Sequence, residues 1–128
     1  MSKKAAIKIW REGAKRNFKI AQDMFKLGHF DWALFLGQLA LEKLLKGLVT
    51  KKTDSAPPYI HNLVGLASAA KIDLTKNQEN ELADITKFHV QARYDEIKYK
   101  LYKTATREYT SNWFKIIRRY YKWLEKLY

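Results

Sequence analysis

The sequence predicts an all-α protein, an antiparallel up-and-down bundle of four long helices plus one short helix. Apolar residues recur every three to four positions through most of the 128 residues, which is the period of an α-helix. No stretch alternates apolar and polar residues between turn formers, as a half-buried strand would. A chain of this length has room for one core, so we expect residues 1–128 to form a single domain.

The first expected helix covers residues 3–27 and is stopped by Gly28. Its apolar stripe consists of Trp10, Ala14, Phe18, Ala21 and Phe25. Its other side is a basic ridge of Lys4, Lys8, Arg11, Lys15 and Lys19, for which a solvated face is the default interpretation. The connection that follows is short, so the first two helices should be antiparallel neighbours, with Asp31 as N-cap of the second.

The second expected helix, residues 31–51, is apolar on almost every side and therefore needs neighbours on both sides. Gln38, Glu42 and Lys46 are spaced four apart and form one polar line along it. This line is either a solvated strip, supported by a Glu42–Lys46 pair worth about 0.3 kcal/mol, or part of a functional site. Lys43 continues an apolar side, where its ammonium must reach outward or find an anion.

The rest of the chain predicts a loop, two further helices and a crossover. Residues 53–60 hold both prolines and form a loop, after which Asn62 or a nearby residue starts the short helix. Thr75 and Gln78 form a capping box for a helix over residues 76–92. We expect that helix to bury Leu82, Ile85 and Phe88 or His89.

The segment that follows, residues 91–109, lacks a clean helical stripe and predicts an irregular crossover with exposed tyrosines. The last helix, residues 107–127, should bury one apolar stripe made of Trp113, Ile116, Ile117, Tyr120, Leu124 and Leu127. Its outer face carries a second basic ridge of Lys115, Arg118 or Arg119, Lys122 and Lys126.

The composition points to a polyanionic partner. The net charge of +12 favours nucleic acid, nucleotide phosphate or an acidic protein. Abundant lysine, no cysteine and many aromatic residues are also typical of proteins from hot environments, so part of the charge can reflect the host.

The sequence also excludes several classes of protein. The absence of cysteine excludes disulfides and thiolate chemistry, and a cytoplasmic location fits it best. No run reaches the roughly 18 apolar residues of a membrane span. The three histidines lie far apart in the sequence, without the spacing of metal ligands, so neither a metal nor another cofactor is expected.

Three short pieces, in this order, resemble the prokaryotic HEPN domain family over roughly residues 5–127. They are GHFDWALFLGQLALEKLLKGL at the end of the first helix and through the second, HNL from His61 to Leu63, and ARYD from Ala92 to Asp95. The resemblance implies a helical-bundle dimer with a nucleotide-binding or RNA-handling role. It also implies frequent pairing with a minimal nucleotidyltransferase encoded alongside.

The nuclease branch of that family carries an arginine followed four to six residues later by a histidine on a late helix. No arginine lies in that window before His29, His61 or His89. We therefore assign no catalytic residue. An RNA-cleaving alternative would need a non-standard pair, such as His61 or His89 with Arg93.

The candidate ligand-binding residues are Lys43, Lys46, His61, Asn62, Arg93 and Tyr94, supported by Gln38, Glu42 and Asp95. The three cations among them can neutralise phosphate oxygens. Tyr94 or Trp32 can stack on a base, and His61 and Asn62 lie at a helix start, where anions are favoured. A structural interpretation stands beside this one: His61 bonds a carbonyl or carboxylate and fixes the loop onto the second helix.

Three functions follow from these observations. The first is a non-catalytic HEPN-like module that binds a nucleotide or nucleic acid and acts as a dimeric partner of a nucleotidyltransferase. The second is RNA cleavage by the non-standard pair. The third is sequence-independent nucleic-acid binding by the two basic ridges, which could be adjacent in the bundle. The excess of aromatic residues between positions 94 and 121 indicates a homodimer.

Overall fold

The computed structural model describes the chain outside residues 92–94, and the side chains outside residues 92–98. The described residues form helices and no strand, so the all-α prediction is confirmed. The helices are α1 (Lys3–Lys26), α2 (Phe30–Lys52), α3 (Leu63–Ala69), α4 (Lys76–Gln91), α5 (Asp95–Thr104) and α6 (Arg107–Glu125). Within this described part of the chain, none of the helices is long and apolar enough to cross a membrane.

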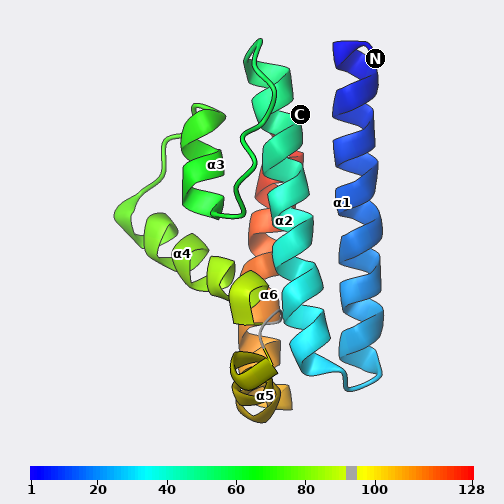
Figure 1. The fold of residues 1–128 in the computed structure, drawn as a ribbon, viewed down its shortest axis with the longest axis vertical. Coiled ribbons are helices and arrows are strands. Elements are labelled where there is room, and N and C mark those ends of the chain that lie inside the picture. The colour runs from blue at the N-terminus through cyan, green and yellow to red at the C-terminus, as the bar shows by residue number, and fades with distance from the viewer. Residues whose placement is uncertain (92–94) are drawn as a thin grey trace.

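Helix α2 is the centre of the fold and packs against every other helix. Figure 1 shows α1 antiparallel to α2, and α6 behind α2, running in the same direction as α2. Helix α4 crosses obliquely, with α3 above it, so α4 does not run alongside α1, α2 and α6 (Figure 1). The expected up-and-down arrangement is therefore present only in part.

The burial of α2 explains its leucine-rich sequence. Leu34, Leu41, Leu44, Leu45 and Leu48 are all fully buried. This confirms the expectation that α2 is covered on both sides. Gln38 and Glu42 are buried as well, so the interpretation of their line as a solvated strip is wrong. The reason is tertiary, because the segment around His61 closes over this side of α2.

The helix ends largely follow the sequence signals. Gly28 has φ of 82°, a backbone conformation that glycine adopts without strain, and it ends α1. The Asn62 side chain accepts from the Gly65 N–H at 3.2 Å and caps α3. The capping box of α4 is confirmed, with distances of 2.9 and 3.1 Å between Thr75 and Gln78.

One predicted cap is wrong. His29 occupies the N-cap position of α2, and Asp31 lies inside the first turn. The Asp31 carboxylate accepts from the neighbouring Trp32 N–H at 3.0 Å. The helix begins earlier than expected because Phe30 packs against Phe25 of α1 and is drawn into the first turn.

The predicted irregular crossover contains a helix, α5. Its described buried residue is Leu101, while Tyr99 and Tyr102 are exposed, as expected. The sequence of this ten-residue helix shows no clear apolar stripe, so periodicity did not predict it.

The apolar stripe of α6 is also shifted from the expected one. Phe114 is buried, whereas Trp113, Ile116 and Leu127 are only partly buried. Phe114 contacts the rings of Phe18 and Phe25 on α1, a second neighbour of α6 that the periodicity did not reveal.

Candidate functional site

Glu42 on α2 is the centre of a buried hydrogen-bond network. The residue is 3% exposed. Its carboxylate accepts from Gln38 Nε2 at 3.2 Å, from Lys46 Nζ at 3.1 Å and from His61 Nδ1 at 3.0 Å. Gln38 Nε2 also donates to the His61 backbone carbonyl at 3.2 Å. The network therefore ties the segment before α3 to α2, as the structural interpretation of His61 expects.

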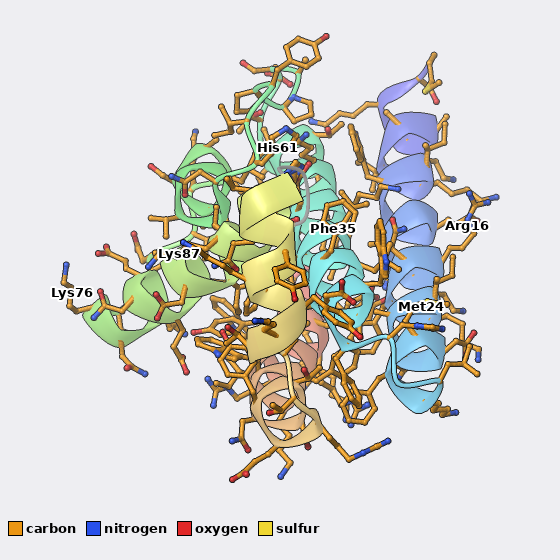
Figure 2. The ribbon with its side chains drawn as sticks, turned by 60° about the horizontal axis from the view of Figure 1, so that its bottom comes forward. Arg16, Met24, Phe35, His61, Lys76 and Lys87 are labelled. Atoms are coloured by element: carbon orange, nitrogen blue, oxygen red, sulfur yellow. The ribbon has the colours of Figure 1, made fainter. Side chains whose placement is uncertain are left out.

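His61 stacks on a second histidine, His89 of α4. The ring centroids are 3.8 Å apart and the planes are inclined by 23°. His89 is 6% exposed, and its ring also contacts Phe35 of α2; His61 and Phe35 are labelled in Figure 2. One ligand atom each from Glu42, His61 and His89 lie within 4.8 Å of one another. The spacing of these residues along the chain did not indicate this arrangement.

The two lysines of the predicted site have different surroundings. The Lys46 side chain is 12% exposed, and its ammonium lies between the Glu42 carboxylate and the Trp10 ring, 5.7 Å from the ring centroid. Its charge is therefore neutralised inside the protein. Lys43 lies instead against α1, where a Cβ at Gly13 would be 3.3 Å from the lysine Cδ.

The position of Lys43 separates it from the network around His61. Burial, and then the nearby charge of Arg16, lower the pKa of the Lys43 ammonium. Lys43 and Arg16 also line an open hollow of about 470 Å³ along α1. The predicted convergence of Lys43 with His61 is therefore not found.

The remaining predicted site residues contribute less. Asn62 is used as a helix cap. Arg93 and Tyr94 lie outside the described residues, and so does the side chain of Asp95 at the start of α5. Of the predicted set, the structure brings together Gln38, Glu42, Lys46 and His61, and it adds His89.

A groove between α1 and α6 forms a second candidate site. It has a volume of about 650 Å³ and is lined by Arg11, Glu12, Lys15, Phe18, Lys19, Gln22, Tyr121 and Glu125. Its floor is aromatic, because Phe18 stacks on Tyr121 with centroids 4.3 Å apart. Gln22 also lines an adjoining hollow with Phe25, Lys26, Ser111, Phe114, Lys115 and Arg118. The basic ridges of the first and last helices line neighbouring hollows: Lys15 of the first ridge lines the groove, and Lys115 and Arg118 of the last ridge line the adjoining hollow.

The charges along this groove are mostly positive. Arg11 donates to Glu125 at 2.7 Å, a hydrogen bond that raises the pKa of the guanidinium, and Lys19 pairs with Asp23 at 2.7 Å. In the part of the chain with described side chains, Lys15, Lys26 and Lys115 form no ion pair. An incoming anion therefore meets three lysines without an ion-pair partner, although Glu12 and Glu125 offset part of the positive charge in the groove.

Comparison with known proteins identifies the family. Residues 7–127 match the family model of the HEPN domain. The chain belongs to the HEPN domain family. A search of curated proteins gave no match.

The fold of this HEPN domain has a counterpart among solved structures. It is similar to the crystal structure of TT1696 from Thermus thermophilus, with a TM-score of 0.80 and 21% sequence identity. The match covers 95% of this chain and 98% of that chain. At this identity the similarity shows a shared fold.

Sequence reasoning missed two features of this HEPN domain. His89 was predicted to face inward but was not placed in the ligand site, because its meeting with His61 depends on how α4 crosses α2. The aromatic floor made by Phe18 and Tyr121 was missed because each residue looks like ordinary core in its own helix. The basic ridge of the first helix, which lines the same groove, was the available signal for this aromatic floor.

Proposed function

We propose that this HEPN domain binds single-stranded nucleic acid in the groove between α1 and α6, without cleaving it. The observation that carries the proposal is the aromatic floor beside a row of cations on α1, with further cations in the adjoining hollow. Proteins that bind single strands regardless of sequence combine a positively charged groove with aromatic rings on which bases stack. Phe18 and Tyr121 supply the rings, Lys15 supplies charge beside them, and Lys26 and Lys115 supply charge in the adjoining hollow.

The size of the groove suits a polymer better than a single nucleotide. Lys15 and Lys26 lie on the same helix, and at 1.5 Å per residue the distance between them along the helix axis is about 16 Å. Lys115 of α6 lines the adjoining hollow together with Lys26. A strand lying along the groove would therefore meet successive cations, whereas a mononucleotide would reach only some of them.

The test is the salt dependence of binding to labelled oligo(U) and oligo(dT), measured by fluorescence anisotropy. For a single strand, log K falls with log salt with a slope of about 0.7 per phosphate contacted. The triple variant Lys15→Gln/Lys26→Gln/Lys115→Gln should therefore reduce the slope by about 2.

A matched triple variant controls for net charge. Lys4, Lys52 and Lys100 are exposed and do not line the groove, so their replacement by Gln removes the same charge elsewhere. Equal losses in both triple variants would contradict a groove site, and so would a salt-insensitive complex. Shortening of the RNA in the same samples would contradict the non-catalytic role.

We further propose that the domain is a homodimer and the partner of a nucleotidyltransferase, as the resemblance to prokaryotic HEPN proteins implies. The exposed rings of Tyr99 and Tyr102 on α5 support an interface there. Light scattering of the purified chain measures its mass in solution, and a monomeric mass would contradict the proposed homodimer. Size-exclusion chromatography of the chain mixed with a minimal nucleotidyltransferase from the same organism tests the proposed partnership, and separate elution would contradict it.

A further inference from the structure

We propose that Glu42, His61 and His89 form a binding site for a divalent first-row transition metal ion such as Zn²⁺ or Ni²⁺. The three side chains come from α2, from the segment before α3 and from α4. One ligand atom from each lies within 4.8 Å of the others. The site is separate from the groove between α1 and α6, so it does not depend on the proposed nucleic-acid binding.

The donor atoms select the class of metal. Two imidazole nitrogens and one carboxylate oxygen form a ligand set that suits Zn²⁺ and its neighbours in the first transition row. Ca²⁺ and Mg²⁺ prefer ligand shells made of oxygen. The metal that we expect is therefore a borderline cation and not a hard one.

The distances are close to those of a metal site. His61 Nδ1 lies 3.0 Å from Glu42 Oε1. Adjacent ligands on an ion with bonds of about 2.1 Å are about 3.0 Å apart in an octahedron and about 3.4 Å apart in a tetrahedron. The two imidazoles are stacked, with planes inclined by 23°, so their in-plane lone pairs run nearly parallel. Metal binding therefore requires one ring to turn until both nitrogens point at the same ion.

The three ligands differ in how freely they can make that rearrangement. Glu42 and His89 are held by burial, whereas the His61 side chain is 49% exposed and follows a loop. His61 can therefore rotate to complete the site. The same exposure gives the ion a route in and leaves coordination positions open to water. The contact of His61 Nδ1 with Glu42 fits the tautomer that carries its proton on Nδ1, and metal binding through Nδ1 would require the other neutral tautomer, with that proton on Nε2.

The residues around Glu42 should affect the affinity of the site for a metal ion in opposite directions. Gln38 orients the carboxylate by donating to it, as outer-shell residues do in metal sites. Lys46 competes for the same carboxylate with its ammonium at 3.1 Å. Removal of the lysine charge should therefore tighten metal binding several-fold, an effect that unspecific binding to a surface histidine would not show.

The experiment uses the full chain without an affinity tag, stripped with a chelator and titrated with ZnCl₂ and NiCl₂ in a calorimeter. We expect one ion per chain. His61→Ala and His89→Gln should each weaken binding at least tenfold, and Lys46→Met should strengthen it. The matched control is His29→Ala, because His29 is exposed, precedes α2 and is the remaining histidine of the chain. It should leave the affinity unchanged.

Three results would overturn the proposal. They are no binding by the unaltered chain, unchanged binding by both His61→Ala and His89→Gln, and a loss of binding in His29→Ala equal to that in His61→Ala. If circular dichroism shows that the buried His89→Gln variant does not fold, His61→Ala decides alone, because its side chain is half exposed. A visible absorption band of the Co²⁺-loaded chain provides an independent readout, and its persistence in His61→Ala would count against the site.

Discussion

Two ion pairs of the same type, one buried and one exposed, provide a direct test of the network around Glu42. Glu42 and Lys46 are four residues apart on α2, with side chains 5% and 12% exposed and a distance of 3.1 Å. Lys8 and Glu12 have the same separation on α1, but their side chains are 74% and 67% exposed and 3.9 Å apart. We expect Glu42→Ala to be far more destabilising than Glu12→Ala.

The expected loss in the free energy of unfolding depends on which groups lose their hydrogen-bond acceptor when each glutamate is removed. Without Glu42, the Lys46 ammonium, the Gln38 amide and the His61 N–H all lose their common acceptor. Breaking a buried ion pair costs about 3–5 kcal/mol, and we expect about 3 kcal/mol because the lysine can turn outward past Trp10. For a chain of this size that lowers Tm by about 10 °C. The exposed pair contributes about 0–1 kcal/mol.

The assay is urea unfolding followed by helical circular dichroism, with the m-value compared between variants to confirm that the same transition is measured. The double variant Glu42→Ala/Lys46→Met should recover part of the loss, because it also removes the stranded ammonium. If Glu42→Ala and Glu12→Ala differ by less than about 1 kcal/mol, the carboxylate of Glu42 is not buried in the way described and the reasoning fails.

Three further predictions concern the groove, the packing of α2 and the response to alkali. Tyr121→Ala should weaken binding of oligo(U) by about 1–3 kcal/mol in fluorescence anisotropy, because a stacking ring is lost. Tyr102 lies outside the groove, so an equal effect of Tyr102→Ala would contradict this prediction. Gly47→Ala should lower the free energy of unfolding by about 1–3 kcal/mol, because the new Cβ would lie 3.0 Å from the Cβ of Trp10. An unchanged Tm would contradict this prediction. Burial raises the pKa of the Tyr120 hydroxyl, so the unfolded chain loses this proton at lower pH than the folded one and stability should fall above about pH 10. Tyr120→Phe should flatten that decline in a series of urea titrations, and a decline as steep as that of the unaltered chain would refute the assignment.

Much of the helical architecture could be predicted because its signals are local. The apolar stripe of α1, the glycine after it and the capping box of α4 placed these helices to within a residue or two of their ends. The same reasoning failed for α5, because this short helix shows no clear apolar stripe in the sequence. It also failed for the direction of α4, because the angle at which one helix crosses another depends on the side chains of both.

The candidate site shows the same division between local and tertiary information. The line of Gln38, Glu42 and Lys46 follows from helical spacing alone, and the contact of His61 with a carboxylate was one of its two interpretations. The stack of His61 on His89 could not be foreseen, because it requires the segment before α3 and the end of α4 to meet over α2. The cations that α1 contributes to the groove were foreseeable from the basic ridge of the first helix, but the aromatic floor was not.

The burial of Glu42 at the centre of a leucine-rich helix is hard to explain by stability alone. Replacing a buried ion pair by apolar residues of similar size is often neutral or stabilising, so an apolar side chain at this position would serve the core at least as well. The carboxylate must therefore contribute something else, either a ligand for a metal or a fixed position for the segment around His61. The double variant Glu42→Leu/Lys46→Met separates these roles. If the metal site is the reason, the variant should keep its Tm and lose Zn²⁺ binding; if the carboxylate mainly positions the segment, residues 53–62 should become sensitive to proteolysis in the absence of any metal.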